Sequence, residues 1–316
     1  MFLIKDKVLE KNEWYQNPMT QAFNKGLNEA ESEEEMVELY FSALLEAKGL
    51  HSDHEKEKFL RAEQNEFLDP FLFKDMELAC EIIGQAIEAD EKILIYGDYD
   101  CDGLTATAIL VRVLRDLGAD VSYFVPDRLQ DGYSLTDKTV DHVLLKKTDL
   151  LITVDCGIND DQEILKLMQA GIKVIVSDHH QADQDINNPA LAIINPKLTN
   201  ENYPFEDLAG AGVAFKLAQA LTSYMNLNSY DLSFALCLAA VGTVADSMPL
   251  KNENRTMVAL ATSIFLKKAP LGLQMLTEKY NNSFQLSASF FGFTIGPRLN
   301  AAGRLGNLEP ALRLLL

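Results

Sequence analysis

The sequence predicts an α/β fold: a doubly wound, mainly parallel five-stranded sheet with flanking helices, an N-terminal helical extension and a C-terminal helical segment. Two observations carry this prediction. Five short runs of β-branched and aliphatic residues are typical of buried parallel strands. Segments of helical period separate the first four runs, and alternation at this spacing implies right-handed crossovers between parallel strands.

The predicted elements follow in chain order. Residues 19–90 have helical patterns, with amphipathic stretches at 36–47 and 76–87. The predicted strands cover residues 92–96, 121–125, 150–155, 173–177 and 191–195, and the helices between the first four cover 104–117, 136–147 and 160–170. Gly118 and Gly171 follow two of these helices, at the position where a helix end favours a left-handed residue. The Gly210-Ala-Gly212 run is interpreted as a helix start, and further helices are predicted at 213–225, 232–245 and 256–267.

This order suggests three regions: the helical extension (1–75), a central α/β domain (76–250) and a helical segment that leads toward a further domain (251–316). The chain stops at residues 309–316, inside an apolar helical pattern with no cap. We therefore expect more protein to follow this segment.

Composition excludes several classes of protein. No stretch approaches the roughly 20 uninterrupted apolar residues of a membrane span, and the N-terminus lacks the pattern of a secretory signal. The four cysteines are far apart and form no Cys-x-x-Cys pair, which argues against a zinc knuckle and a disulfide scaffold. We expect a cytoplasmic protein with no membrane partner.

The formal net charge of -19 would by itself argue against nucleic-acid binding, because Lys and Arg supply the contacts to phosphates. Many of the acids, however, lie before residue 90, in runs such as 31–35. Other acids are candidate metal ligands, whose charge bound cations would offset. A local patch, rather than the global charge, decides binding.

The most informative motif is Tyr96-Gly-Asp-Tyr-Asp-Cys-Asp-Gly103, directly after the first predicted strand. Asp98, Asp100 and Asp102 repel one another unless a cation lies between them. Hard oxygen ligands suit Mg²⁺ or Mn²⁺, and ligands bind at the carboxyl ends of strands in open α/β sheets. The motif predicts a metal site on a loop at the end of this strand.

Other candidate ligands follow later strands and helices. Asp155 ends the third strand, Asp178-His179-His180 follows the fourth, and Asp246 ends an apolar helix. Each alone is more often a turn former, a helix cap or a surface residue. The strand-end residues share one edge of the predicted sheet, and Asp246 needs only a helix docked across it, so together they favour a two-metal site. Cys101 and Cys156 beside them are interpreted as small packing residues.

These motifs resemble the four ordered motifs of the DHH phosphoesterases, over roughly residues 70–316. Within that family, 97–106, 241–246 and Gly296-Pro-Arg-Leu-Asn-Ala-Ala-Gly-Arg304 resemble the bacterial exonucleases that degrade single-stranded DNA from 5′ to 3′, in recombination and repair. Pyrophosphatases and phosphodiesterases of short oligonucleotides in the family would carry a histidine at the position of Tyr96, so this residue disfavours both.

The resemblance implies roles for individual residues. Asp100 and Asp155 would hold one metal, with Asp98 close by. Asp102, Asp155, His179 and Asp246 would hold the other. His180 would contact the scissile phosphate, with Asp178 as structural support, and Arg298, Asn300 and Arg304 would clamp the nucleic-acid backbone. We interpret the segment that carries these last three residues as a loop, in which the glycines allow close approach to a phosphate.

The distribution suits phosphodiester hydrolysis, because two cations about 3.5 to 4 Å apart can activate a water and stabilise the leaving oxygen. Complete members of this branch have two further domains that would supply much of the basic DNA groove. We therefore expect this chain to hold Mn²⁺ or Mg²⁺ but to degrade single-stranded DNA slowly or without tight binding. The resemblance also implies a single-strand-binding protein and a helicase as partners.

Two alternatives stay open: a phosphodiesterase for short oligonucleotides or cyclic dinucleotides, and a non-catalytic DHH scaffold in a repair assembly. The residues themselves indicate metal-dependent phosphoester hydrolysis. The direction of digestion and the preference for DNA rest on the resemblance alone.

Overall fold

The structure is a computed structural model that describes residues 30, 32–61, 63, 66–127, 132, 134–183, 187–279 and 286–316. The chain divides into two compact units, residues 1–61 and 62–316. The predicted boundaries at residues 75 and 250 remain predictions, and the predicted helical pattern at 19–29 lies outside the described residues.

The described residues of the first unit form two helices, α2 (Glu33–Ala47) and α3 (Asp53–Leu60). Ser32 caps the first by accepting a hydrogen bond from the Glu35 amide, and Ser52 forms a capping box with Glu55 at the start of the second. An ion pair of 2.9 Å between Lys56 and Glu46 joins the two helices. Local sequence signals therefore set both helix starts.

The second unit is built on a five-stranded sheet in which every pair of neighbouring strands is parallel, in the order β2-β1-β3-β4-β5. Its strands are β1 (Lys92–Gly97), β2 (Asp120–Phe124), β3 (Leu150–Val154), β4 (Lys173–Ser177) and β5 (Ala192–Ile194). This confirms the predicted fold class. The strand order reverses between β1 and β3, the point at which such sheets open a crevice for ligands.

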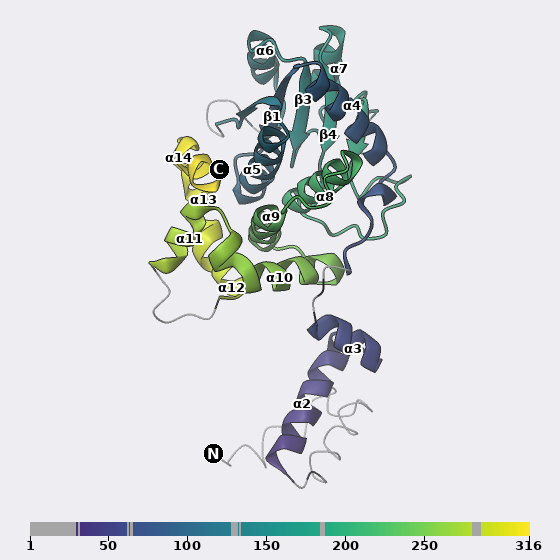
Figure 1. Cartoon of the computed structure of the whole chain (residues 1–316), viewed down its shortest axis with the longest axis vertical. Coiled ribbons are helices and arrows are strands. Elements are labelled where there is room, and N and C mark those ends of the chain that lie inside the picture. Colours follow the sequence, from purple (N-terminus) through teal and green to yellow (C-terminus); the bar gives the residue numbers. More distant parts are fainter. Residues whose placement is uncertain are drawn as a thin grey trace. The chain divides into compact units, whose positions relative to one another are not determined.

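Alternate residues of the strands pack on opposite faces of the sheet. Ile93 and Ile95 of β1 join a core with α4 (Met76–Glu88), α5 (Cys101–Asp116) and α8 (Gly210–Tyr224). Leu94 and Tyr96 join a smaller core with α6 (Asp137–Leu145) and α7 (Asp161–Gln169) on the other face (Figure 1). Both faces are covered, which explains why the strands are apolar runs rather than alternating ones.

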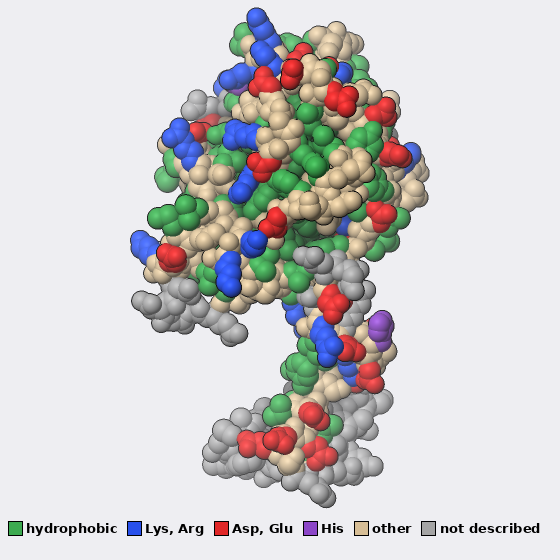
Figure 2. All heavy atoms as spheres, viewed as in Figure 1, with side chains coloured by type: hydrophobic (Ala, Val, Ile, Leu, Met, Phe, Trp, Pro, Cys, Tyr) green, Lys and Arg blue, Asp and Glu red, His purple; other side chains and the backbone are tan. Residues whose placement is uncertain are grey.

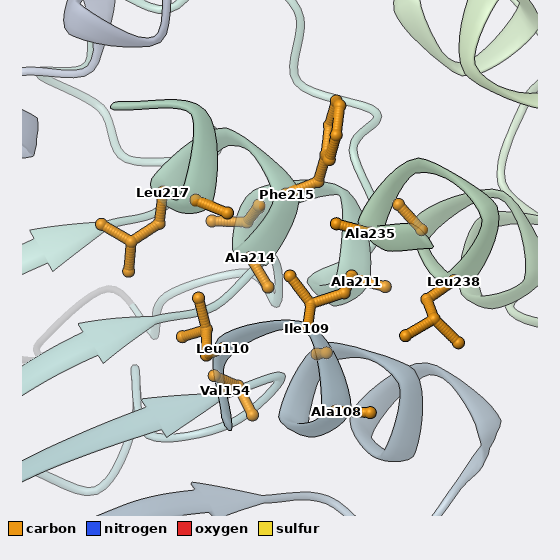
Figure 3. Close-up of a cluster of buried hydrophobic side chains, with 14 of the residues drawn as sticks. Ala108, Ile109, Leu110, Val154, Ala211, Ala214, Phe215, Leu217, Ala235 and Leu238 are labelled. Carbon is orange, nitrogen blue, oxygen red and sulfur yellow. The ribbon is translucent and has the colours of Figure 1, made fainter. Parts of the chain in front are cut away.

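Small residues bring three helices close together on the larger face. Figure 3 shows Ala108, Ala211 and Ala235 where α5, α8 and α9 (Ser233–Ala245) meet. Gly242 of α9 has no room for a side chain, because a Cβ there would lie 2.5 Å from Asp102 Oδ1 and 2.7 Å from the Ala211 Cβ. The helix that ends at Asp246 is thereby held against the start of α5.

The C-terminal region is helical, as predicted. It comprises α10 (Asn252–Lys268), α11 (Leu271–Glu278), α12 (Ala288–Phe290), a π-helical turn η4 (Phe291–Ile295), α13 (Gly296–Arg304) and α14 (Glu309–Leu315). A short 3-10 turn, η3 (Pro70–Leu72), precedes α4. Among the described residues no single helix is long and apolar enough to cross a membrane; only α10 and α11 together, bent by 90° at their junction, reach that length and composition.

Two local predictions differ from the structure. Helix α5 begins at Cys101, three residues before the predicted start, because the Asp100 side chain caps it. The segment Gly296–Arg304 is helix α13 rather than a loop, with Pro297 in its first turn, where proline is tolerated.

Candidate metal centre

The candidate ligands come together at the carboxyl edge of the sheet. They lie on four segments that are distant in sequence and adjacent in space. Asp98 follows β1, and Asp100 and Asp102 lie at the start of α5. Asp155 follows β3, and the residues after β4 include His179. Asp246 is the C-cap residue of α9, which lies across this edge. The topology thus unites residues that are up to 148 positions apart in the sequence, from Asp98 to Asp246.

Asp100 and Asp102 have different surroundings. One oxygen of Asp100, Oδ1, accepts hydrogen bonds from the backbone N–H groups of Asp102 (2.9 Å) and Gly103 (3.0 Å). Asp102 is buried, and its two oxygens accept hydrogen bonds from the first amides of α8, Gly210 (2.7 Å) and Ala211 (2.9 Å). The positive N-terminal ends of α5 and α8 therefore both face aspartates, which partly offsets their negative charge.

Asp155 is held in an unusual backbone conformation. Its φ is +60°, the left-handed region that non-glycine residues seldom adopt, and Gly157 two residues later has a φ of +105°. The Asp155 side chain is buried against Gly210, where an added Cβ would lie 2.5 Å from its Oδ1. This sharp turn after β3 directs the carboxylate into the centre of the cluster.

His179 lies among three carboxylates. Its Nε2 is 3.1 Å from Asp155 Oδ1, 3.7 Å from Asp102 Oδ2 and 3.7 Å from Asp246 Oδ2. Burial, together with the neighbouring His180, lowers the pKa of His179 to about 4. The imidazole is therefore neutral at pH 7, the form in which histidine binds a metal.

Asp178 supports the segment that carries both histidines. Its Oδ1 accepts hydrogen bonds from the His179 amide (2.7 Å) and the His180 amide (3.1 Å) and lies 2.8 Å from His180 Nδ1, while Oδ2 accepts from the Ile158 amide (3.0 Å). The bond to Asp178 raises the pKa of His180, whose side chain is 41% exposed. Burial alone would raise the pKa of Asp178, but its bonds to His180 and to the Ile158 amide lower it overall.

The cluster fits a hard divalent cation. Burial and the nearby Asp100 raise the pKa of Asp98 to about 7 and that of Asp102 to about 8, and burial beside other aspartates raises the pKa of Asp155. The buried Oδ1 of Asp98 has no hydrogen-bond partner among the described residues. Carboxylates that repel one another in this way, with a neutral imidazole among them, are suited to Mg²⁺ or Mn²⁺.

The ligand atoms form three overlapping groups, within each of which all atoms lie within 4.8 Å of one another. These groups are Asp98, Asp100 and Asp155; Asp102, His179 and Asp246; and Asp155, His179 and His180. Asp155 belongs to two of these groups. Its Oδ1 also lies 3.1 Å from Nε2 of His179, which is a member of the third group. The geometry therefore offers overlapping candidate sites for a cation, and Asp155 is shared by two of them.

The residues predicted to contact nucleic acid lie on α13. Arg298 is exposed, and its Nη1 donates a hydrogen bond to the Thr294 carbonyl (2.5 Å); Arg304 is also exposed. Asn300 points inward instead, and its Oδ1 accepts a hydrogen bond of 2.7 Å from the Cys101 amide at the start of α5. The structure therefore places Asn300 against the metal-binding segment.

Sequence reasoning missed the part played by the backbone of α8. The Gly210-Ala-Gly212 run predicts the helix start correctly, but its amides also bind Asp102, and its first glycine makes room for Asp155. The only signal was two glycines at the start of an apolar helix. Cys101 and Cys156 are buried, and burial raises the pKa of both thiols, which agrees with packing rather than thiolate chemistry.

A separate pocket of about 660 Å³ lies at the other end of α5, where Arg112 and Arg115 face Lys267 and Lys268 of α10. Arg112 is ten residues beyond Asp102, about 15 Å along the helix. Asp116 and Asp231 also line this pocket. Its charge is mixed, and it contains none of the candidate ligands.

The chain is similar to a known protein family and to several known proteins. The DHH family, N-terminal domain, matches residues 92–243. The single-stranded-DNA-specific exonuclease RecJ of Bacillus subtilis (strain 168) is 37% identical over 276 residues, which are 87% of this chain and 34% of the relative. The chain thus spans about a third of that relative's length.

Solved structures give the same result. A crystal structure of exonuclease RecJ bound to manganese has a TM-score of 0.72 at 40% identity, with 79% of this chain and 63% of that chain covered. RecJ from Thermus thermophilus in complex with Mg²⁺ has a TM-score of 0.60 at 33% identity, with 87% of this chain and 35% of that chain covered.

Proposed function

Because this chain contains a DHH-family N-terminal domain and is a homologue of the RecJ exonucleases, we propose that it hydrolyses phosphodiester bonds with two divalent cations, Mn²⁺ or Mg²⁺, and acts on single-stranded DNA from the 5′ end. The observation that carries the proposal is the position of Asp155, whose buried carboxylate belongs to two adjacent groups of metal-ligand side chains.

In this proposal the two cations divide the ligands unequally. Asp100 and Asp155 would hold one, with Asp98 beside them, and Asp102, Asp155, His179 and Asp246 would hold the other. Bound cations of this kind lower the pKa of a water and stabilise a leaving oxygen. The backbone amides of α8 hold the Asp102 carboxylate, and the turn at Asp155 sets the direction of its carboxylate.

The two adjacent histidines take different tasks. His179 stays neutral and is a ligand, whereas His180 is protonated more readily because Asp178 accepts a hydrogen bond from its Nδ1–H group. A protonated His180 at the exposed rim supplies a charged donor to the non-bridging oxygens of the scissile phosphate, where negative charge accumulates. Asp178 thus orients His180 and favours its protonated form without touching the substrate.

The exposed arginines of α13 position the nucleic acid. We assign Arg298, and Arg304 further along the same helix, to contacts with the phosphate backbone, for which guanidinium groups have a suitable geometry. The chain carries net charge -19, and Figure 2 shows mixed charge on one face. We therefore expect weak binding of DNA by this chain and a strong dependence of that binding on salt.

The decisive experiment follows digestion of a long single strand, labelled at its 5′ or its 3′ end, in the presence of Mn²⁺. We expect the 5′ label to be released first, as a mononucleotide. The Asp155→Asn variant should lower the rate at least about 100-fold, since a neutral amide is a poor ligand for hard cations. Asparagine tolerates a positive φ, so this variant should fold.

Asp141→Asn is the matched control, because it makes the same chemical change at an exposed position on α6 and should keep the wild-type rate. Release of the 3′ label first would contradict the proposed direction. Faster hydrolysis of a dinucleotide than of the long strand would favour the phosphodiesterase alternative. If Asp155→Asn digests DNA as fast as the wild type, the proposed site is wrong.

A further inference from the structure

The first turn of α5 is held from two directions. The N-terminal amides of a helix have no partner within the helix and need acceptors from elsewhere. Asp100 Oδ1 accepts hydrogen bonds from the amides of Asp102 and Gly103. The Cys101 amide donates to a different acceptor. Its acceptor is Asn300 Oδ1, 2.7 Å away and 199 residues later in the chain.

The contact belongs to a close fit between α13 and the metal-binding segment. Gly303, one turn after Asn300, has no space for a side chain, because an added Cβ would lie 2.7 Å from the Tyr99 carbonyl oxygen. At its other end, α13 meets α9, where a Cβ on Gly296 would lie 3.1 Å from the Ala245 Cβ. Helix α13 thus touches the residues next to Asp98, Asp100 and Asp246.

We propose that Asn300 is a positioning residue of the metal centre: its side-chain carbonyl fixes the first turn of α5 and, through it, the carboxylates of Asp100 and Asp102. This inference rests on the proposed metal site. It assigns the amide oxygen of Asn300 to the protein rather than to the nucleic acid. The oxygen must face Cys101, because only an acceptor can meet the backbone N–H.

The chemistry explains why a side chain is used here. The two cations would need the carboxylates of Asp100 and Asp102 in fixed directions, and these directions follow the backbone of residues 100–102. Loss of the acceptor would leave the Cys101 amide without a partner in a buried segment, and the turn would shift to find one. Residues that orient metal ligands in this way typically change metal affinity about 10- to 100-fold when they are removed.

The experiment measures Mn²⁺ binding to the full chain in the absence of DNA, by the electron paramagnetic resonance signal of free Mn²⁺. Asn300→Ala removes the acceptor and should weaken Mn²⁺ binding about 10- to 100-fold. Asn300→Asp keeps an oxygen at the same place and should bind within about threefold of the wild type. Asn307→Ala, at an exposed position just after α13, is the matched control and should bind as the wild type does.

A second measurement in the metal-free chain reports the contact directly. Hydrogen exchange at the Cys101 amide should be slow in the wild type and in Asn300→Asp, and faster in Asn300→Ala. A residue that only contacts DNA would change neither measurement.

Wild-type affinity in Asn300→Ala would overturn the inference, as would equal loss of affinity in Asn300→Ala and Asn300→Asp. A failure of the wild type itself to bind Mn²⁺ would instead overturn the proposed function.

Discussion

At the level of single residues, the site contains buried carboxylates whose charged form is less stable than that of an exposed aspartate. Asp98, Asp102 and Asp155 are buried beside like charges, and each has a raised pKa. An acid whose pKa is higher in the folded state than in the unfolded state binds more protons when folded. Its contribution to stability is therefore lost as the pH rises through the folded pKa.

This sign predicts that the metal-free chain loses stability between about pH 6.5 and about pH 8 and that the loss levels off above this range. The slope is up to about 1.4 kcal/mol per pH unit for each proton that the folded state retains and the unfolded state has lost. The pKa values of about 7 for Asp98 and about 8 for Asp102 lie in this window. His179 acts in the opposite direction, but only below its ordinary pKa of 6.5. Urea unfolding in the presence of a chelator measures the slope.

Saturating Mn²⁺ should reverse the sign of this slope, because cations require deprotonated ligands and so stabilise the chain more at high pH. A metal-free chain whose unfolding free energy rises over the same range would contradict the assignment of raised pKa values to these aspartates.

At the scale of the element, two helix starts organise the centre. Helix α5 begins shortly after β1 and carries Asp100 and Asp102 in its cap and first turn. Helix α8 begins at Gly210 and presents its first amides to Asp102. Glycine is required at this start because the α8 backbone passes so close to Asp155.

We predict that Gly210→Ala disturbs the centre. The added methyl would lie 2.5 Å from Asp155 Oδ1 and 2.6 Å from its Cβ, so either the helix or the carboxylate must move. Forced packing of this kind typically costs about 1 to 3 kcal/mol. We expect a loss of that size in the unfolding free energy and weaker Mn²⁺ binding, as measured by denaturant unfolding and isothermal titration calorimetry.

Gly84→Ala is a suitable comparison, because a Cβ at this position in α4 would meet its nearest neighbour at 3.7 Å, an ordinary contact. It should gain about 0.5 to 1 kcal/mol from helix propensity and leave Mn²⁺ binding unchanged. Unaltered Mn²⁺ affinity in Gly210→Ala would show that Asp155 does not need its observed position.

At the scale of the whole molecule, a buried ion pair joins distant parts of the second unit. Lys216 of α8 is fully buried and donates to Glu253 of α10 at 2.8 Å and to the Leu68 carbonyl. Glu253 also accepts from the Leu68 amide at 2.9 Å and from the Tyr203 hydroxyl. The pair therefore fixes the segment before α4 against α8, the helix that supports the metal centre.

Lys216→Met should destabilise the chain by about 3 to 5 kcal/mol, because it leaves Glu253 as a buried charge without its cation. Lys216→Met combined with Glu253→Gln should recover part of this loss. Lys268→Met makes the same substitution at an exposed pair with Asp231 and should cost at most about 1 kcal/mol. Urea unfolding measures the free energy of unfolding of the three variants. Equal losses of this free energy in Lys216→Met and Lys268→Met would show that burial does not make the Lys216–Glu253 pair more important.

The fold class and the candidate ligands can be predicted from local patterns in the sequence. Apolar strand runs and helical periods are local signals, and they predict the sheet and the helices to within a few residues. The Asp98–Asp102 motif, Asp155 and Asp178–His180 stand at strand ends, and parallel strands place their carboxyl ends at one edge. This rule brings together residues that are far apart in the sequence.

How these residues are held depends on the packing of distant segments and could not be predicted from local patterns. The left-handed turn at Asp155, the amides of α8 on Asp102 and the reach of Asn300 to Cys101 depend on contacts between segments separated by up to 199 residues. The structure also shows that residues 296–304, which were predicted to form a loop, form helix α13. Local patterns specify residue types and periodicity, whereas hydrogen-bond partners and steric fit are set by how the elements pack.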